Sequence, residues 1–226
     1  MLIEIFADLI CPWCFIGWRR LRTALAERPA LHAELCWRPF QLNPDMPPGG
    51  MDRQLYLHAK FGSRERARQI YGVVEETARR DGLALDLSLI RRTPNTFDAH
   101  RLIRWAERSG DAMGLVEALF QTYFMEGGDI SDRDLLAGAA GAAGYSPDEA
   151  KELLESDDEA AAVRTADALA RQMGLHAVPC FVFDRRYALS GAQEPASLLP
   201  LLDLGISGGM ATRPLSPAAG FIEAGP

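Results

Sequence analysis

This chain of 226 residues is 48% hydrophobic and has a formal net charge of −7 at pH 7. The length and apolar content are sufficient for a sizeable core, and the negative charge argues against a nucleic-acid-binding surface. Because no window has the ~20 apolar residues needed to span a bilayer, and the first fifteen residues lack a signal-peptide pattern, we expect a mature cytoplasmic protein that binds neither nucleic acid nor membrane.

The first fifty residues are predicted to contain two strands and one helix. The apolar run 2–6 is typical of a short strand, and the amphipathic pattern 12–27 predicts a helix that begins shortly after it. Residues 34–42 alternate like a second strand. The segment 43–50 is rich in Pro and Gly, and this composition predicts a loop.

The middle of the chain has a different pattern. From about residue 52 to residue 173 it is almost continuously helical, with breaks at Gly- and Pro-containing segments. Ser146, which precedes a proline and an acidic residue at helix-start spacing, predicts one helix cap, and Ser131, followed by Asp134, predicts another.

Strand character returns near the carboxyl end, at residues 180–183 and 187–189. A last helix is predicted over residues 195–204. The tail, residues 206–226, is rich in Gly, Ala, Ser and Pro, and we expect it to be flexible or to pack on a partner.

The order of these elements predicts the fold class. Strand, helix, strand, long helical segment, strand, strand and helix is the order of an α/β protein with a thioredoxin fold. A large all-helical insertion would lie between its second and third strands. We expect a thioredoxin-like domain made of residues 1–50 and 175–205, and a helical insertion domain of residues 51–174.

The sequence Cys-Pro-Trp-Cys lies at residues 11–14, where the first strand passes into the first helix. At a helix start, unpaired N–H groups and the helix dipole stabilise negative charge, so a thiol there can titrate at roughly 3.5 to 7.5 instead of about 8.5. We therefore expect Cys11 to be substantially thiolate. Cys14, about one helical turn further on, could reach the sulfur of Cys11 and release a bound product.

Two other interpretations of the cysteines compete with this one. The pair could be two buried structural thiols, or it could be half of a zinc site completed by Cys36 and Cys180. The remaining cysteines and the four histidines have no recognisable ligand spacing, so no metal is expected. Cys36 and Cys180 fall in strand patterns, which is typical of core positions.

Several segments of the chain carry motifs of one known group of proteins. They are residues 11–17 (CPWCFIG), 37–44 (WRPFQLNP), 93–102 (TPNTFDAHRL), and Val178-Pro179 together with 190–193 (SGAQ). By these segments, which extend over roughly residues 1–204, the chain resembles the DsbA-like thioredoxin superfamily and, within it, the cytoplasmic FrnE-type dithiol-disulfide oxidoreductases. The same scaffold is similar to kappa-class glutathione transferases and 2-hydroxychromene-2-carboxylate isomerases, where serine typically replaces the first cysteine.

The resemblance implies a role for each residue that matches the motif. Cys11 would be the attacking thiol, Cys14 the resolving thiol, and Pro179 a cis proline facing them. A cis bond would turn the backbone of Val178 toward an extended substrate, which could add to the sheet as a strand. The chain departs from the family at Cys180, which stands where a Thr or an aromatic residue is usual.

Four further residues are candidates for the substrate site. Pro12 has no N–H to leave unpaired in the first helical turn, and Trp13 would offer aromatic surface beside the reactive sulfur or act as a plain packing residue. His100 could donate to the thiolate or to a bound carboxylate, although a lone helical histidine is usually structural. Asn95, five residues earlier, would accompany it.

We therefore expect a thiol-disulfide oxidoreductase or isomerase that acts on a protein or small-molecule disulfide or dithiol. No bound cofactor is expected, and glutathione would serve as redox partner or co-substrate. A glutathione-dependent isomerase or transferase is the alternative, and a non-catalytic peptide-binding protein is a third reading. The apolar surface of the insertion and the tail is compatible with a homodimer.

Overall fold

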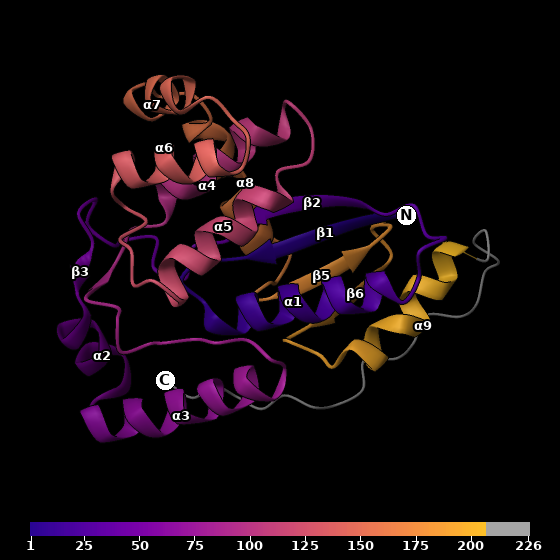
Figure 1. Ribbon diagram of the computed structural model, residues 1–226, viewed down its shortest axis with the longest axis horizontal. Helices are drawn as coiled ribbons and strands as arrows, with labels where there is room; N and C mark the ends of the chain where they lie inside the picture. Colours follow the sequence, from indigo (N-terminus) through magenta and orange to yellow (C-terminus); the bar gives the residue numbers. More distant parts are fainter. Residues whose placement is uncertain (207–226) are drawn as a thin grey trace.

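The computed structural model describes residues 1–206, and its centre is a four-stranded sheet (Figure 1). The strands follow the order β2 (Glu34–Pro39), β1 (Leu2–Ala7), β5 (Cys180–Phe183) and β6 (Tyr187–Ser190). β1 and β2 are parallel, whereas β5 is antiparallel to both β1 and β6. The structure thus confirms the predicted thioredoxin fold.

Two helices belong to the sheet and pack against each other. α1 (Pro12–Ala26) connects β1 to β2, as a parallel strand pair requires, and α9 (Pro195–Ile206) follows β6. The predicted start of the tail, Ile206, is the last residue of α9, and residues 207–226 lie outside the part of the chain that the structure describes. No helix within residues 1–206 is long and apolar enough to cross a membrane.

The segment between β2 and β5 forms the predicted helical insertion. In the view of Figure 1 most of its helices gather above the sheet, while α3 runs below α1. It also contains a two-residue strand pair, β3 and β4, which the sequence did not predict because two residues are too few to show an alternating pattern. The elements are β3 (Met51–Asp52), α2 (Arg53–Phe61), α3 (Arg64–Arg80), β4 (Arg92–Thr93), α4 (Phe97–Glu107), α5 (Met113–Phe124), α6 (Arg133–Ala142), α7 (Pro147–Glu155) and α8 (Ala160–Gln172).

One predicted helix cap is confirmed and the other is displaced by one residue. The Ser146 side chain accepts the N–H of Glu149 at the start of α7, at 3.3 Å. The cap of α6 is Asp132 rather than Ser131, because the Ser131 hydroxyl bonds to the Asp129 carboxylate at 2.6 Å.

β2 ends at Pro39, three residues earlier than predicted. The N–H groups of Gln41 and Leu42 donate to two buried carboxylates, Asp167 at 2.8 Å and Asp8 at 2.6 Å, instead of to a neighbouring strand. The chain therefore leaves the sheet at this point and forms the loop that borders the insertion.

Most buried apolar residues of the sheet and of the insertion form one cluster, and a second, smaller cluster contains Phe6, Phe40, Ala170 and Cys180. Phe15 of α1 stacks on Phe120 of α5, with ring centroids 4.9 Å apart and planes inclined by 12°. Trp37 of β2 meets the same ring edge-on at 6.0 Å. The two predicted domains thus share a core, and this shared core fixes the insertion beside the amino end of α1.

Candidate active site

The two cysteines of the 11–14 motif lie at the amino end of α1. Cys11 is the capping residue of the helix, with extended backbone angles, and its N–H donates to the carbonyl of Asp8 at 3.1 Å. Pro12 is the first helical residue, and no side chain caps the helix start. This local geometry follows from the sequence, since proline is pre-set for the first turn and has no N–H to satisfy.

The pKa values of the two thiols are shifted in opposite directions. A hydrogen bond from the Cys14 thiol is the largest cause that lowers the pKa of Cys11, against the opposing effect of burial. Burial raises the pKa of Cys14 well above its ordinary value, and the hydrogen bond to Cys11 raises it further. The direction of the Cys11 shift agrees with the expectation, and the neighbouring thiol is its largest cause. The pair consists of one sulfur suited to the thiolate form and one suited to the thiol form.

The loop before β5 lies against the Cys11 sulfur. The Val178–Pro179 peptide bond is cis, as the resemblance implied. The Sγ of Cys11 lies 3.7 Å from the carbonyl oxygen of Val178. The Cys11 sulfur and the backbone before the cis proline are therefore adjacent.

Gly17 permits this close approach, and the sequence analysis gave it no role. A Cβ atom at Gly17 would lie 2.9 Å from Cγ of Pro179 and 3.2 Å from the ring of Phe181, which is closer than packed carbon atoms approach. A glycine two turns into a helix is unfavourable by propensity, and this signal could have identified it as a packing position.

Trp13 and Pro12 are half-buried, so each has surface that a substrate could contact. Trp13 also packs against the main apolar cluster. Both interpretations of this side chain, packing and substrate contact, are therefore compatible with its position.

His100 does not lie on the surface of the site. Its side chain is fully buried, its Nδ1 is 3.0 Å from the indole nitrogen of Trp37, and its Nε2 is 3.4 Å from a carboxylate oxygen of Asp8. α4 thus places this side chain inside the protein, in contact with Trp37 and Asp8 and not at an exposed face.

Asn95 binds loops rather than the thiols. Its amide nitrogen donates to the carbonyl of Met46 at 2.5 Å, and its oxygen accepts the N–H of Phe97 at 2.8 Å and the side chain of Gln41 at 3.3 Å. It thereby ties the segment after β2 to the start of α4.

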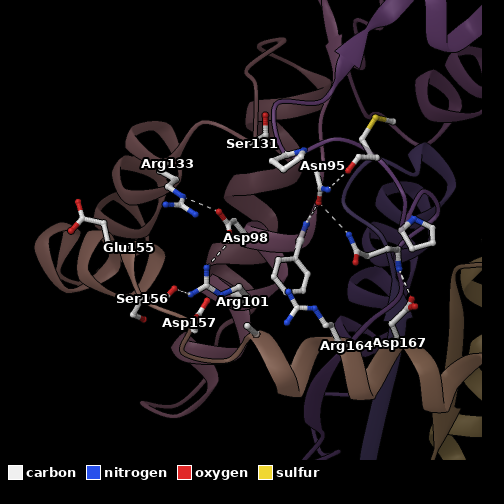
Figure 2. A pocket seen from close by; sticks show the side chains of 16 residues that line it. Asn95, Asp98, Arg101, Ser131, Arg133, Glu155, Ser156, Asp157, Arg164 and Asp167 are labelled. Atoms are coloured by element: carbon white, nitrogen blue, oxygen red, sulfur yellow. Dashed lines mark hydrogen bonds and ion pairs between the residues drawn. The ribbon is translucent and has the colours of Figure 1, made fainter.

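Asn95 also lines a cavity of about 560 Å³, shown in Figure 2. Within it, the Asp98 carboxylate lies between the guanidinium groups of Arg101 at 2.7 Å and Arg133 at 2.9 Å. Neither cysteine of the motif lines this cavity. The charges of Asp98, Arg101 and Arg133 pair with one another, and we place the candidate site at the cysteine turn and not in this cavity.

A second cavity, of about 480 Å³, lies on the other side of the same loop. Pro44 and Met46 line both cavities, and the second is also lined by Tyr56 and Lys60 of α2. Lys60 is close enough to Cys11 for its charge to favour the thiolate, although less than the Cys14 hydrogen bond does. Lys60 therefore links this cavity electrostatically to Cys11, although neither cysteine of the motif lines it.

The two remaining cysteines lie in the sheet. Cys180 is buried at the start of β5, opposite Phe6 and Ser190, and Cys36 lies half-buried in β2, opposite Glu4. Within residues 1–206, no three Cys, His, Asp or Glu side chains are grouped so that they could hold a metal ion.

Comparison with known proteins gives a match over nearly the whole described chain. The profile of the family described as DSBA-like thioredoxin domain matches residues 2–203. A crystal structure described as probable DsbA oxidoreductase SCO1869 from Streptomyces coelicolor is 29% identical, with a TM-score of 0.82 over 99% of this chain and 97% of that chain. Fold and sequence therefore agree on one family.

Two further relatives are more distant. The structure of cytosolic disulfide reductase DsbM from Pseudomonas aeruginosa with GSH is 18% identical, with a TM-score of 0.61 over 92% of this chain and 96% of that chain. This likeness is one of fold alone. The uncharacterized protein YwbO of Bacillus subtilis (strain 168) is 24% identical over 175 residues, which are 77% of this chain and 78% of that protein.

Proposed function

Since the chain belongs to the DsbA-like thioredoxin family, we propose that it is a thiol-disulfide oxidoreductase or isomerase that works through Cys11 and Cys14. The main support for this proposal is that the pKa of Cys11 is lowered and the pKa of Cys14 is raised. A lowered pKa supplies the thiolate that attacks, and a raised pKa keeps the second thiol protonated until it resolves the intermediate.

The reaction is a pair of thiol-disulfide exchanges. The Cys11 thiolate attacks one sulfur of a substrate disulfide, a mixed disulfide forms, and the other substrate sulfur leaves as a thiolate. Cys14 then loses its proton and attacks the Cys11 sulfur, which releases the second substrate thiolate and forms the Cys11–Cys14 disulfide. The substrate gains two electrons, and the pair loses two.

Two glutathione thiols would return the pair to the dithiol form, giving glutathione disulfide, so that no bound cofactor is needed. The reverse sequence of steps would oxidise a substrate dithiol. Which direction prevails depends on the potential of the pair relative to that of its compartment, which we propose to be the cytoplasm.

The substrate, a protein or small-molecule disulfide, would bind across the face that exposes Trp13 and Pro12. The Val178 carbonyl beside Cys11, with Pro179 next to it, offers an edge for an extended chain. Asn95 would act from the neighbouring loop, whose position it fixes. We also propose that the protein forms a homodimer, because apolar surface is expected on the insertion and on the tail.

A glutathione-dependent isomerase is the second candidate function, and the cavity beside Lys60 favours it. That cavity is lined by Lys60, whose positive charge acts on Cys11, and a cation there would suit a small anionic thiol. In such an enzyme the glutathione thiolate would be the nucleophile, and Cys14 would be dispensable.

One experiment separates the two candidates. The wild-type protein and the Cys14→Ser variant are assayed for reduction of a disulfide peptide by glutathione, and the protein mass is followed. The oxidoreductase proposal predicts turnover by the wild type and accumulation of a substrate adduct on Cys11 in Cys14→Ser. No disulfide reduction by the wild type, together with unchanged turnover of a chromene substrate by Cys14→Ser, would establish the isomerase instead.

A further inference from the structure

Asp8 places a carboxylate inside the protein directly before the cysteine turn. Its side chain is fully buried, and Oδ2 accepts the N–H of Leu42 at 2.6 Å. Within the described residues Oδ1 has no hydrogen-bond partner, and it lies 3.4 Å from Nε2 of His100, which has none either. This oxygen thus faces a side chain of α4 that lies 92 positions further along the chain.

The contact with Trp37 fixes the proton position on His100. An indole N–H can only donate, so His100 Nδ1, 3.0 Å from it, must be the acceptor. The neutral ring then carries its proton on Nε2, which faces Asp8. Charging the ring would put a second proton on Nδ1 and break the contact with Trp37. The N–H of His100 therefore lies toward the Asp8 carboxylate, at 3.4 Å and without a hydrogen bond between them, so the positive end of its dipole faces the carboxylate.

Asp8 also touches the cysteine turn. Its carbonyl oxygen accepts the N–H of Cys11 at 3.1 Å. Burial is the main cause of the raised pKa of Cys14, and the negative charge of Asp8 adds to it. For Cys11 the hydrogen bond from Cys14 lowers the pKa, and the charge of Asp8 opposes this effect. An ionised Asp8 thus disfavours a thiolate at either sulfur.

Few other ionisable groups face this pair from the surrounding elements. Tyr123 of α5 is buried within electrostatic reach of Asp8, and Lys60 of α2 is within reach of Cys11. Glu107 of α4 accepts the N–H of Trp37 at 2.7 Å, and Asp167 of α8 accepts the N–H next to that of Leu42. Lys60 and Asp8 therefore act on Cys11 with opposite signs.

We propose that Asp8 and His100 are positioning residues that set the redox potential of the Cys11–Cys14 pair, an inference that rests on the proposed function. The dithiol form contains a thiolate and the disulfide form does not, so a nearby carboxylate charge destabilises the dithiol form and makes the pair a stronger reductant. His100 places an N–H dipole beside that charge. Because His100 belongs to α4, the insertion takes part in setting the potential.

The test compares Asp8→Asn, His100→Asn and His100→Gln with the wild type. Each protein is equilibrated at pH 7 with glutathione and glutathione disulfide; oxidation forms the Cys11–Cys14 bond and reduces one glutathione disulfide to two thiols. The reduced fraction is measured by alkylation and mass spectrometry. The exposed His32→Gln serves as the control variant, and circular dichroism confirms folding.

Asp8→Asn is expected to shift the equilibrium toward the dithiol roughly tenfold, equivalent to about 30 mV, and to lower the pKa of Cys11. His100→Asn retains only an acceptor near the Nδ1 position and should shift the equilibrium in the same direction. His100→Gln can place an amide N–H near the Nε2 position and should remain near the wild type, as should His32→Gln.

The outcomes distinguish this inference from the proposed function. If the wild type does not exchange with glutathione, the proposed function fails. If it exchanges, but Asp8→Asn and His100→Asn keep its equilibrium and its Cys11 pKa, the inference is overturned. Should Asp8→Asn not fold, the contrast between the two His100 variants decides. Nitrogen NMR of the wild type adds a check, since a His100 proton on Nδ1 at pH 7 contradicts the proposed arrangement.

Discussion

The cysteine turn and the sheet each hold two cysteines, and the four thiols show what position alone does to one side chain. Burial raises the pKa of Cys36 and of Cys180, both in strands. Cys11 is as well buried as many core residues, yet its pKa is lowered. The difference is a donor, the Cys14 thiol, together with a helix start where no side chain competes for the free N–H groups.

The largest predicted effect comes from replacing one cysteine of the turn by serine, with the same replacement in the sheet as the control. Cys11→Ser should reduce glutathione-dependent disulfide reduction to the uncatalysed background, because a hydroxyl does not replace a thiolate nucleophile. Cys36→Ser should keep the wild-type rate, since its sulfur lies in β2 away from the turn. A peptide-reduction assay measures both. An equal loss of reduction rate in the two variants would contradict the distinction between the cysteine turn and the sheet.

A packing change at the turn should have the next largest effect. Gly17→Ala would put a methyl group 2.9 Å from Pro179, so we expect about 1–3 kcal/mol of destabilisation and a slower exchange rate. Gly72→Ala, on the exposed face of α3 with nothing within 4 Å, is the matched control and should stabilise by about 0.5–1 kcal/mol. Urea unfolding measures both. A neutral Gly17→Ala would show that the loop does not depend on this contact.

The smallest predicted effect is the contribution of the buried Cys180 thiol to the pH dependence of stability. The folded pKa of Cys180 is raised above its unfolded value of about 8.5, so its contribution to stability is complete below that pH and is lost as the pH rises. The loss amounts to about 1.4 kcal/mol per pH unit until the folded pKa is reached. Both proteins are compared with their own stability at pH 7. Between pH 8.5 and 10 the Cys180→Val variant should lose less unfolding free energy than the wild type. Thermal melts that stay parallel over this range would contradict the prediction.

The sequence predicted much of the fold because local patterns determine it. The four strands of the main sheet, α1 and the Ser146 cap follow from alternation, amphipathicity and capping chemistry, all of which act over a few residues. The end of β2 could not be predicted in this way, because distant carboxylates take the N–H groups of Gln41 and Leu42.

The same limit applies to the candidate site: its local features could be predicted from the sequence, and its contacts between distant residues could not. The cysteine spacing and the helix start lie within one short segment, whereas the contact between Asp8 and His100 joins residues 92 positions apart. Gly17 belongs to a motif that the sequence analysis singled out, but its reason, the approach of Pro179, exists only in three dimensions.

The most direct measurement is the rate of iodoacetamide alkylation of each cysteine in the reduced protein between pH 4 and pH 10, resolved by peptide mass spectrometry. The account predicts that Cys11 reacts with a midpoint below the ordinary thiol value of about 8.5, and that Cys36 reacts with a midpoint above it. A Cys11 midpoint at or above that of Cys36 would contradict the central claim that the turn, and not the sulfur itself, makes the reactive thiolate.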